Sequence, residues 1–198
     1  VCDSLVYSSK DSCLSLYTDP ILWQGPQQLL GEEIKVYMND STIDWAHIIN
    51  QALAVEMNDS IHYNQVTGKE MKAFFRNGEM HQVDVDGNVL CIYYPVEEGD
   101  TTLMMMDYTE SSHLRMVLKD RKLERGAFIG HTTGVVYPMD QIPADRLRLD
   151  AFAWFDYVRP RSKEDIFEWR GKGADAVLRK SDRKPIGSAR DLNIKRKK

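Results

Sequence analysis

The segment GKEMKAFFRNGEMHQVDVDG, residues 68–87, carries a pattern that occurs three times in the chain. Two other segments align with it at their native lengths and without gaps: GEEIKVYMNDSTIDWAHIIN at 31–50 and SSHLRMVLKDRKLERGAFIG at 111–130. The offsets between copies are 37 and 43 residues, a range in which internal repeats indicate stacked or rolled architectures. We therefore treat this segment as the unit from which the chain is built.

Each copy begins with three apolar residues at alternate positions and a basic residue between the first and the second. The three sets are Met71, Ala73 and Phe75 with Lys72; Ile34, Val36 and Met38 with Lys35; and Leu114, Met116 and Leu118 with Arg115. Alternation over five residues is typical of a β-strand with one dry and one wet face, and not of a helix. Each copy therefore opens with a strand whose apolar trio faces the interior.

The second half of each copy predicts a return strand. A polar pair follows each trio, and the next apolar residue comes at Ile43, Met80 or Leu123. Polar turn residues between two apolar runs predict a β-hairpin. The following interior position comes three residues later instead of two, at Ala46, Val83 or Gly126. A step of three within a period of two predicts a β-bulge at the same place in each copy, which would bend the sheet consistently.

The rest of the chain is also predicted to be β structure. Short apolar pieces separated by turn residues occupy residues 1–30, as in all-β domains. We expect the first return strand to end near Asn50, a further strand pair around 58–60, a hairpin turn at 84–88 and new strands at 88–94 and 103–108. The last predicted strand is 134–138.

Two C-terminal features stand apart from the repeats. The aromatic stretch 147–157 is predicted to cap one open end of the sheet. Ser162 to Asp165 resembles a capping box and predicts a short helix that ends at Gly171. We divide the chain into a β domain at 1–160 and a short helix with a basic, disordered tail at 161–198. The division follows the change in composition.

Composition restricts the class of protein. The chain has 198 residues, of which 42% are hydrophobic, enough for a core. Its net charge of −4 is uneven: residues 179–198 carry +7 and the remainder −11. No apolar run approaches the roughly 20 residues that span a bilayer, so a transmembrane segment is not predicted and we expect a soluble protein. Because strand pattern begins at the first residues, we expect a fragment of a longer protein or a chain without its leader.

Sequence motifs for catalysis or metal binding are weak. The five histidines are scattered, and neither a nucleophile elbow nor a phosphate-binding loop occurs. Residues 84–88 lack the terminal acid of a calcium loop, so a turn is the better prediction. Three cysteines without C-x-x-C spacing favour inert thiols over a disulfide framework or a zinc site. We expect no enzyme activity, no cofactor, no metal and, on an acidic body, no nucleic-acid partner.

The dry face is rich in methionine, whose flexible thioether adapts to irregular space and to apolar ligands. An ordinary closed core would account for this composition as well as a ligand site would. Several short motifs then point to a known family: YTDPILW at 17–23, LGEEI at 30–34, NQVTGKEM at 64–71 and NGEM at 77–80. In these motifs and their order the chain resembles the OstA-like family over roughly residues 5–137. That family includes the lipopolysaccharide-transport protein LptA and the N-terminal domain of the translocon LptD.

The resemblance implies a rolled antiparallel sheet, a half-open jelly roll of the LptA type, with a short helical C-terminal extension in this chain. It implies a non-catalytic module for lipopolysaccharide transport and outer-membrane assembly in the Gram-negative periplasm. Lipopolysaccharide or a related lipid would be held in the interior by Ile34, Val36, Met38, Met71, Ala73, Phe75, Met80, Leu114, Met116 and Leu118. Implied partners are other OstA-like domains, joined edge to edge, and outer-membrane translocon proteins. The alternative is a structural scaffold that joins like domains through exposed sheet edges and has no lipid slot.

Overall fold

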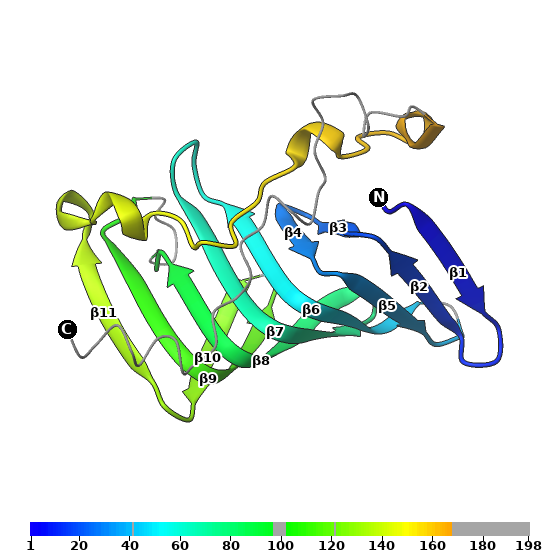
Figure 1. Ribbon diagram of the computed structural model, residues 1–198, viewed down its shortest axis with the longest axis horizontal. Helices are drawn as coiled ribbons and strands as arrows, with labels where there is room; N and C mark the ends of the chain where they lie inside the picture. The colour runs from blue at the N-terminus through cyan, green and yellow to red at the C-terminus, as the bar shows by residue number, and fades with distance from the viewer. Residues whose placement is uncertain (41, 97–101, 121, 168–198) are drawn as a thin grey trace.

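The computed structural model describes residues 1–40, 42–96, 102–120 and 122–167. Within these ranges eleven strands form one sheet, and the remaining regular elements are short 3-10 turns (Figure 1). The strands are β1 Ser4–Ser8, β2 Cys13–Tyr17, β3 Ile21–Gln24, β4 Gln27–Leu30, β5 Glu33–Met38, β6 Ile43–Met57, β7 Tyr63–Arg76, β8 Glu79–Tyr93, β9 Met105–Lys119, β10 Lys122–Ile129 and β11 Thr133–Pro138. The predicted all-β class is confirmed.

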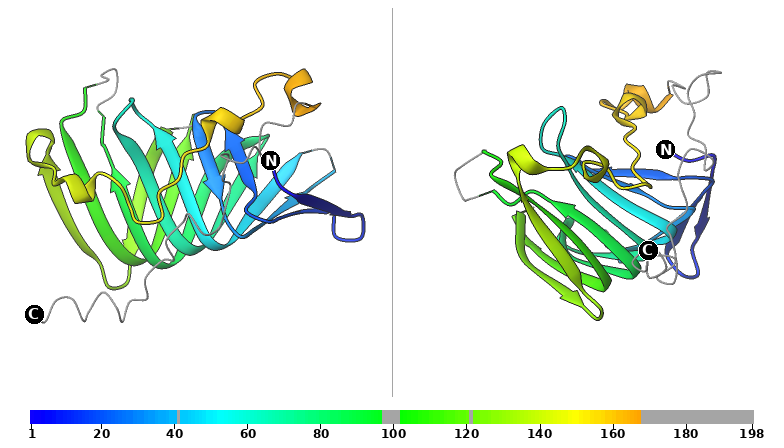
Figure 2. Two further views of the ribbon diagram at one scale, coloured as in Figure 1. Left: turned by 45° about the horizontal axis from the view of Figure 1, so that its top comes forward. Right: turned by 60° about the vertical axis from the view of Figure 1, so that its left-hand side comes forward.

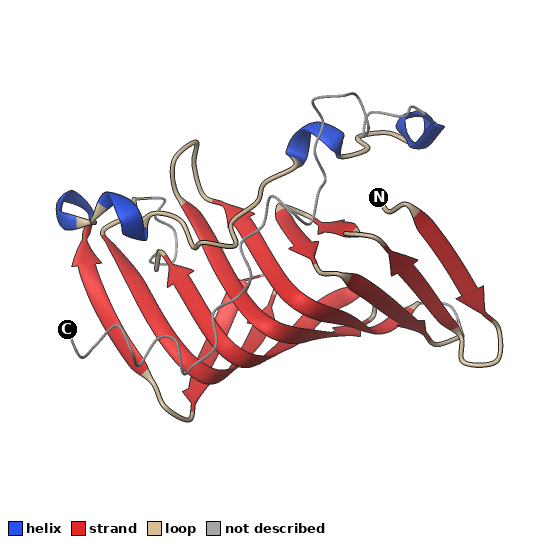
Figure 3. Cartoon of the chain, in the orientation of Figure 1, coloured by secondary structure: helices blue, strands red, loops and turns tan. Residues whose placement is uncertain are grey.

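Every strand pair in the sheet is antiparallel. The main order is β1-β2-β5-β6-β7-β8-β9-β10; β11 pairs with β9, and the β3–β4 hairpin pairs with β6. The sheet is strongly curved, as the two turned views in Figure 2 show, and Figure 3 shows that strands make up most of the described chain. The predicted rolled antiparallel sheet is therefore the fold that forms.

The three predicted hairpins are β5–β6, β7–β8 and β9–β10. In the first, Tyr37 lies opposite Trp45 and Met38 opposite Ile43, so Asp44 is the extra residue of a bulge. His81 and Glu124 are the extra residues of the other two hairpins. These positions are again 37 and 43 residues apart. The bulge that the step of three predicts is thus confirmed in every copy.

The return strands do not stop where the sequence predicted. β6 continues past Asn50 to Met57, and β8 passes through 84–88, so the predicted strand end at Asn50 and the hairpin turn at 84–88 are wrong. Asn50 has φ +55° and Gly87 has φ +81°, values that kink a strand without ending it. Asn and Gly in the left-handed region serve turns and strand irregularities alike, so sequence alone did not distinguish the two.

Two other predicted boundaries also merge. The predicted strand 88–94 is the last part of β8, and the predicted strand 103–108 is the first part of β9, which runs unbroken from Met105 to Lys119. The predicted strand 134–138 corresponds to β11. Long strands of 14 or 15 residues are possible here because the kinks allow the sheet to bend without losing its pairing.

A close approach within the sheet explains the glycine that opens the first two copies. A Cβ atom on Gly31 would lie 2.6 Å from Ile48 Cγ2, and one on Gly68 would lie 2.5 Å from Val85 Cγ1. Ile48 and Val85 are fully buried and are related by the same 37-residue offset. No side chain fits at either glycine without moving this pair of core residues.

Beyond the kinks, both faces of the sheet are covered. Ala52 and Ala54 face the interior of the roll, whereas Leu53 and Val55 face a separate cluster on the opposite side. This second cluster includes Phe152 and the following residues. The continuous apolar run 52–55 fits a strand that is buried on both faces.

The segment 139–158, which we name the strap, provides this outer cover. Figure 1 shows it crossing the strands in yellow from β11 toward β3 and β4. The buried Gln65 side chain donates to Leu147 O (2.9 Å) and accepts from Leu149 N (2.9 Å). Gln28 likewise donates to Ala153 O (2.9 Å) and accepts from Phe155 N (2.8 Å). Each glutamine therefore holds the strap as a neighbouring strand would.

The strap corrects one prediction and the following turn corrects another. Residues 147–157 do not cap an open end of the sheet; they pack on its outer face, because Gln28 and Gln65 point to that side. The predicted helix is one 3-10 turn, Glu164–Phe167, with Asp165 N donating to Ser162 Oγ at 3.3 Å. The continuation to Gly171 and the basic tail lie outside the described residues.

Candidate functional site

The inner face of the roll is an apolar slot, which we define as the cluster around Ile34, Ile48, Met71, Val85 and Leu114. Most of its members come from β5 to β9, with Leu16 of β2 and Leu29 of β4 added, so each repeat supplies one part of the wall. The basic residue of each copy points to the opposite face, as predicted from the alternation.

Two of these three outer-face bases, Lys35 and Arg115, are engaged in local ion pairs. Arg115 donates to both carboxylate oxygens of Asp84, at 2.8 and 2.9 Å, and these hydrogen bonds raise the pKa of the guanidinium. Lys35 lies 3.4 Å from Glu33, whose charge raises the pKa of the ammonium. The outer face of these strands is thus a polar, solvated surface, in contrast to the slot.

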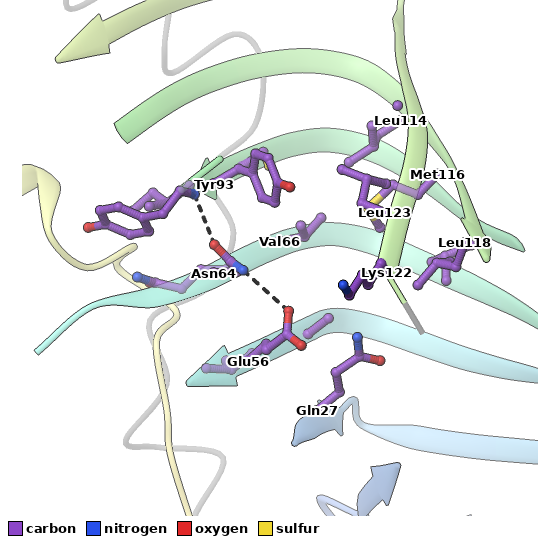
Figure 4. A pocket seen from close by; sticks show the side chains of 18 of the residues that line it. Gln27, Glu56, Asn64, Val66, Tyr93, Leu114, Met116, Leu118, Lys122 and Leu123 are labelled. Atoms are coloured by element: carbon purple, nitrogen blue, oxygen red, sulfur yellow. Dashed lines mark hydrogen bonds between the residues drawn. The ribbon is translucent and has the colours of Figure 1, made fainter. Parts of the chain in front are cut away.

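Part of the slot is unfilled. A cavity of about 760 Å³ lies between β4, β6, β7 and β8 on one side and β9 and β10 on the other. Met71, Met80, Leu114, Met116 and Leu118 contribute to its apolar lining, and Figure 4 shows several of these side chains from close by. Ligand pockets in proteins are commonly about 300–1,000 Å³. The cavity therefore has the size of a binding site.

The ten residues predicted to contact lipid fall into three groups. Five of them line the cavity: Met71, Met80, Leu114, Met116 and Leu118. Four others belong to the slot but do not line the cavity: Ile34, Val36, Ala73 and Phe75. Met38 lies at the end of β5 and is 38% exposed, outside the slot cluster. Alternation identified the correct face, but it did not reveal how far along that face the packing extends.

Sequence reasoning missed the polar end of the cavity. Asn64 Nδ2 donates to Glu56 Oε2 (3.2 Å), and Asn64 Oδ1 accepts from Tyr94 N (2.9 Å). Tyr93, whose pKa is raised by burial, lies beside them, and Lys122 stands across the opening (Figure 4). Glu56, Asn64 and Tyr93 occupy interior phases of their strands, and polar residues in an apolar phase are the signal that could have identified them.

Among the described residues that line the cavity, Cys91 carries a thiol. Cys91 is buried, and burial raises the pKa of its thiol to about 12, so it stays protonated at neutral pH. Cys13 is a second buried free thiol, and Cys2 is partly buried. Among the described residues, no three His, Cys, Asp or Glu side chains converge as metal ligands would.

No helix in the described part of the chain has the length and apolar character needed to cross a membrane. The curved antiparallel sheet with its inner slot has the LptA-like fold of OstA proteins. The chain is similar to the crystal structure of LptH, the LptA-homologous periplasmic component of the conserved lipopolysaccharide transport device from Pseudomonas aeruginosa. The TM-score is 0.51 at 12% identity, over 70% of this chain and 93% of LptH. No protein-family model matches the sequence, and no curated protein matches it. The comparison confirms the predicted fold.

Proposed function

We propose that this protein is a non-catalytic lipid-binding module in lipopolysaccharide transport or outer-membrane assembly. The observation that carries the proposal is the open cavity of about 760 Å³ in the apolar slot, lined by members of the repeated trios. LptH, which shares the fold, is described as a periplasmic component of a lipopolysaccharide transport device. That description supports a periplasmic, cell-envelope location for this chain as part of the same proposal.

The energetics suit acyl chains. Each methylene removed from water stabilises a complex by about 0.8 kcal/mol, so a dozen carbons supply ample binding energy without any specific polar contact. The flexible side chains of Met71, Met80 and Met116 can adjust to acyl chains that run through the cavity in different ways. Lipopolysaccharide or a related lipid with several acyl chains is the ligand class we propose.

The proposal excludes a chemical step. The buried thiol of Cys91 is protonated, and the polar groups at the cavity end are engaged in hydrogen bonds such as that from Asn64 to Glu56. The absence of a chemical step is tested by incubating the full chain with lipopolysaccharide and measuring the molecular mass of the recovered lipid by mass spectrometry. Recovery of unchanged lipid is expected, and cleaved lipid would contradict a non-catalytic module.

Partners are proposed from the sheet edges. β1 ends the sheet on one side, and its Leu5, Val6 and Tyr7 are exposed; β11 exposes Val135 and Val136 on the other side. Unpaired edge strands are templates for strand addition. We propose edge-to-edge pairing with other OstA-like domains, including those of outer-membrane translocon proteins.

These same edges favour the alternative function, a scaffold that only assembles with its neighbours. A scaffold needs no unfilled interior, whereas the slot here contains a cavity lined by apolar side chains. The cavity therefore favours the lipid-binding proposal over the scaffold.

Site-specific photo-crosslinking in the presence of lipopolysaccharide distinguishes the two functions. A photoreactive phenylalanine analogue at Met116 or Leu118, both in the cavity lining, should attach to lipid. The same analogue at Lys72 or Arg115, on the outer face, is the matched control and should not. Equal labelling on both faces, or none on either, would contradict lipid binding in the slot.

A further inference from the structure

Gly126 lies in the middle of β10, and neither a close contact nor the backbone conformation requires glycine at this position. Gly31 and Gly68 are required by a close contact, and Gly87 and Gly130 by positive φ angles of +81° and +97°. Gly126 has neither property: its φ lies outside the left-handed region, and a Cβ atom placed on it has nothing within 4 Å. Glycine within a strand weakens the strand, and it often marks the close approach of a ligand or another backbone.

The repeat shows what is missing at this position. Ala46 and Val83 are equivalent to Gly126 in the first two copies, and their side chains are buried in the slot, with 2% and 4% exposed. Gly126 is exposed and lines the cavity as Val83 does, but it has no side chain to fill the space. The open space therefore lies where the third copy lacks the side chain that the other two have.

The surroundings of this space are apolar. Gly126 pairs directly with Met116 across the β9–β10 ladder, so the absent side chain would point into the slot as Met116 does. Phe128, two residues along β10, lies on the same face and also lines the cavity. An occupant of this notch would touch backbone, thioether and aromatic carbon, which suits a hydrocarbon chain.

We propose that Gly126 is a specificity-determining residue, at which an acyl chain of the bound lipid passes against the backbone of β10. The inference rests on the proposed function and adds to it the position at which the chain crosses the wall. Because a Cβ atom at 126 meets no protein atom within 4 Å, a side chain there would extend into the path of the ligand.

A size series at this position tests the proposal in the full chain, with a fluorescent 12-carbon fatty acid as the probe. Gly126→Ala should bind almost as the unmodified protein does, Gly126→Leu more weakly and Gly126→Trp most weakly. Displacing the contacts of about two methylenes corresponds to about a tenfold loss of affinity. Thermal unfolding temperatures should be unchanged or raised throughout, because the space is open and glycine is a poor strand residue.

Ala127→Trp is the matched control. Ala127 lies next in the same strand, opposite Arg115 on the outer face, so the same bulk there should leave probe binding unchanged. If Gly126→Trp binds as the unmodified protein does while Met116→Asp no longer binds, the inference is wrong and the proposed function stands. If the unmodified protein does not bind the probe, the proposed function is wrong, and the inference that rests on it is wrong as well.

Two further results would overturn the inference. Loss of stability in Gly126→Ala would show that the space is not open to a side chain. A change in sedimentation of Gly126→Trp, with probe binding intact, would show that a second copy occupies the notch instead of lipid. Graded loss of binding with unchanged stability and sedimentation supports the proposal.

Discussion

The first two hairpins and the third are built from the same repeat, but they differ in how completely the protein covers them. In β5–β6 and β7–β8 the interior positions Ile34, Val36, Met71 and Ala73 are buried. In β9–β10, Leu114 is buried, but Met116, the equivalent of Val36 and Ala73, is only partly buried. The third hairpin lies at the end of the sheet order, where no other strand of the described residues pairs with the outer edge of β10. The same pattern thus buries the middle position of the trio in the first two hairpins and leaves it partly open at Met116 in the third.

The difference is repeated at the first residue of each copy. Gly31 and Gly68 permit the contact with Ile48 and Val85, whereas the third copy has Ser111. The Ser111 hydroxyl donates to a backbone carbonyl, with His113 O and Ile129 O both at 3.1 Å, and lies 2.9 Å from Thr132 Oγ1. Ser111 is buried, with 6% of its surface exposed, and its hydroxyl is tolerated there because these hydrogen bonds satisfy it. Three predictions test how far this contrast extends.

The largest effect is expected from a charge at a fully buried position of the second hairpin. Ala73→Asp should destabilise the protein by roughly 4 kcal/mol or more, because Ala73 is 0% exposed, lies outside the cavity lining, and an unpaired carboxylate there loses its hydration. Met116→Asp should cost only about 1–3 kcal/mol, since the carboxylate stays partly hydrated at the cavity, and should prevent lipid binding. Urea unfolding and probe titration measure both. Equal losses of stability would show that the third hairpin is as closed as the second.

An intermediate effect is expected from exchanging the first residues of the copies. Gly68→Ser should cost about 1–3 kcal/mol, because the new Cβ atom would overlap Val85 and lie 3.1 Å from Asp86 O. Ser111→Gly should cost about 1 kcal/mol, through the lost hydrogen bonds. Urea unfolding of the two variants gives the comparison. A larger loss in Ser111→Gly than in Gly68→Ser would reverse the order of packing that we infer.

The smallest effect concerns the turn that links the first hairpin to the second. Asp59 accepts hydrogen bonds from His62 Nδ1 and from the backbone N–H groups of Ile61 and His62, each at 2.7 Å. The hydrogen bond to the His62 side chain is the main cause that lowers the pKa of Asp59 from 3.8 to about 2. The unfolded chain therefore binds this proton more tightly than the folded one does. The stability contributed by Asp59 is full above its unfolded pKa and is lost as pH falls through about 2.

Asp59→Asn is the matched variant, because it keeps the shape of the side chain and does not titrate. Between about pH 5 and pH 2 the free energy of unfolding should fall more steeply in the unmodified protein than in Asp59→Asn. Parallel pH profiles would show that the turn does not depend on the carboxylate. In that case the turn between the first two hairpins would make no pH-dependent contribution to the free energy of unfolding in acid.

Much of the candidate site could be predicted from sequence, since the alternation of each trio assigns residues such as Met71 and Met116 to the inner face. The cavity within that face could not be predicted. It depends on Gly126 standing where Ala46 and Val83 fill the other copies, and on which strands end the sheet. The polar group of Glu56, Asn64 and Tyr93 was missed because its members come from three strands and meet only after folding.

The hairpins, the faces of their strands and the bulges at Asp44, His81 and Glu124 can be predicted from the sequence alone. These features follow from local periodicity, because side chains alternate along a strand and an extra residue shifts that alternation. The position of the strap on the outer face, held by Gln28 and Gln65, and the open part of the slot at the third hairpin depend on tertiary packing. Periodicity specifies which way a side chain points, whereas residues more than 80 positions away decide what covers it.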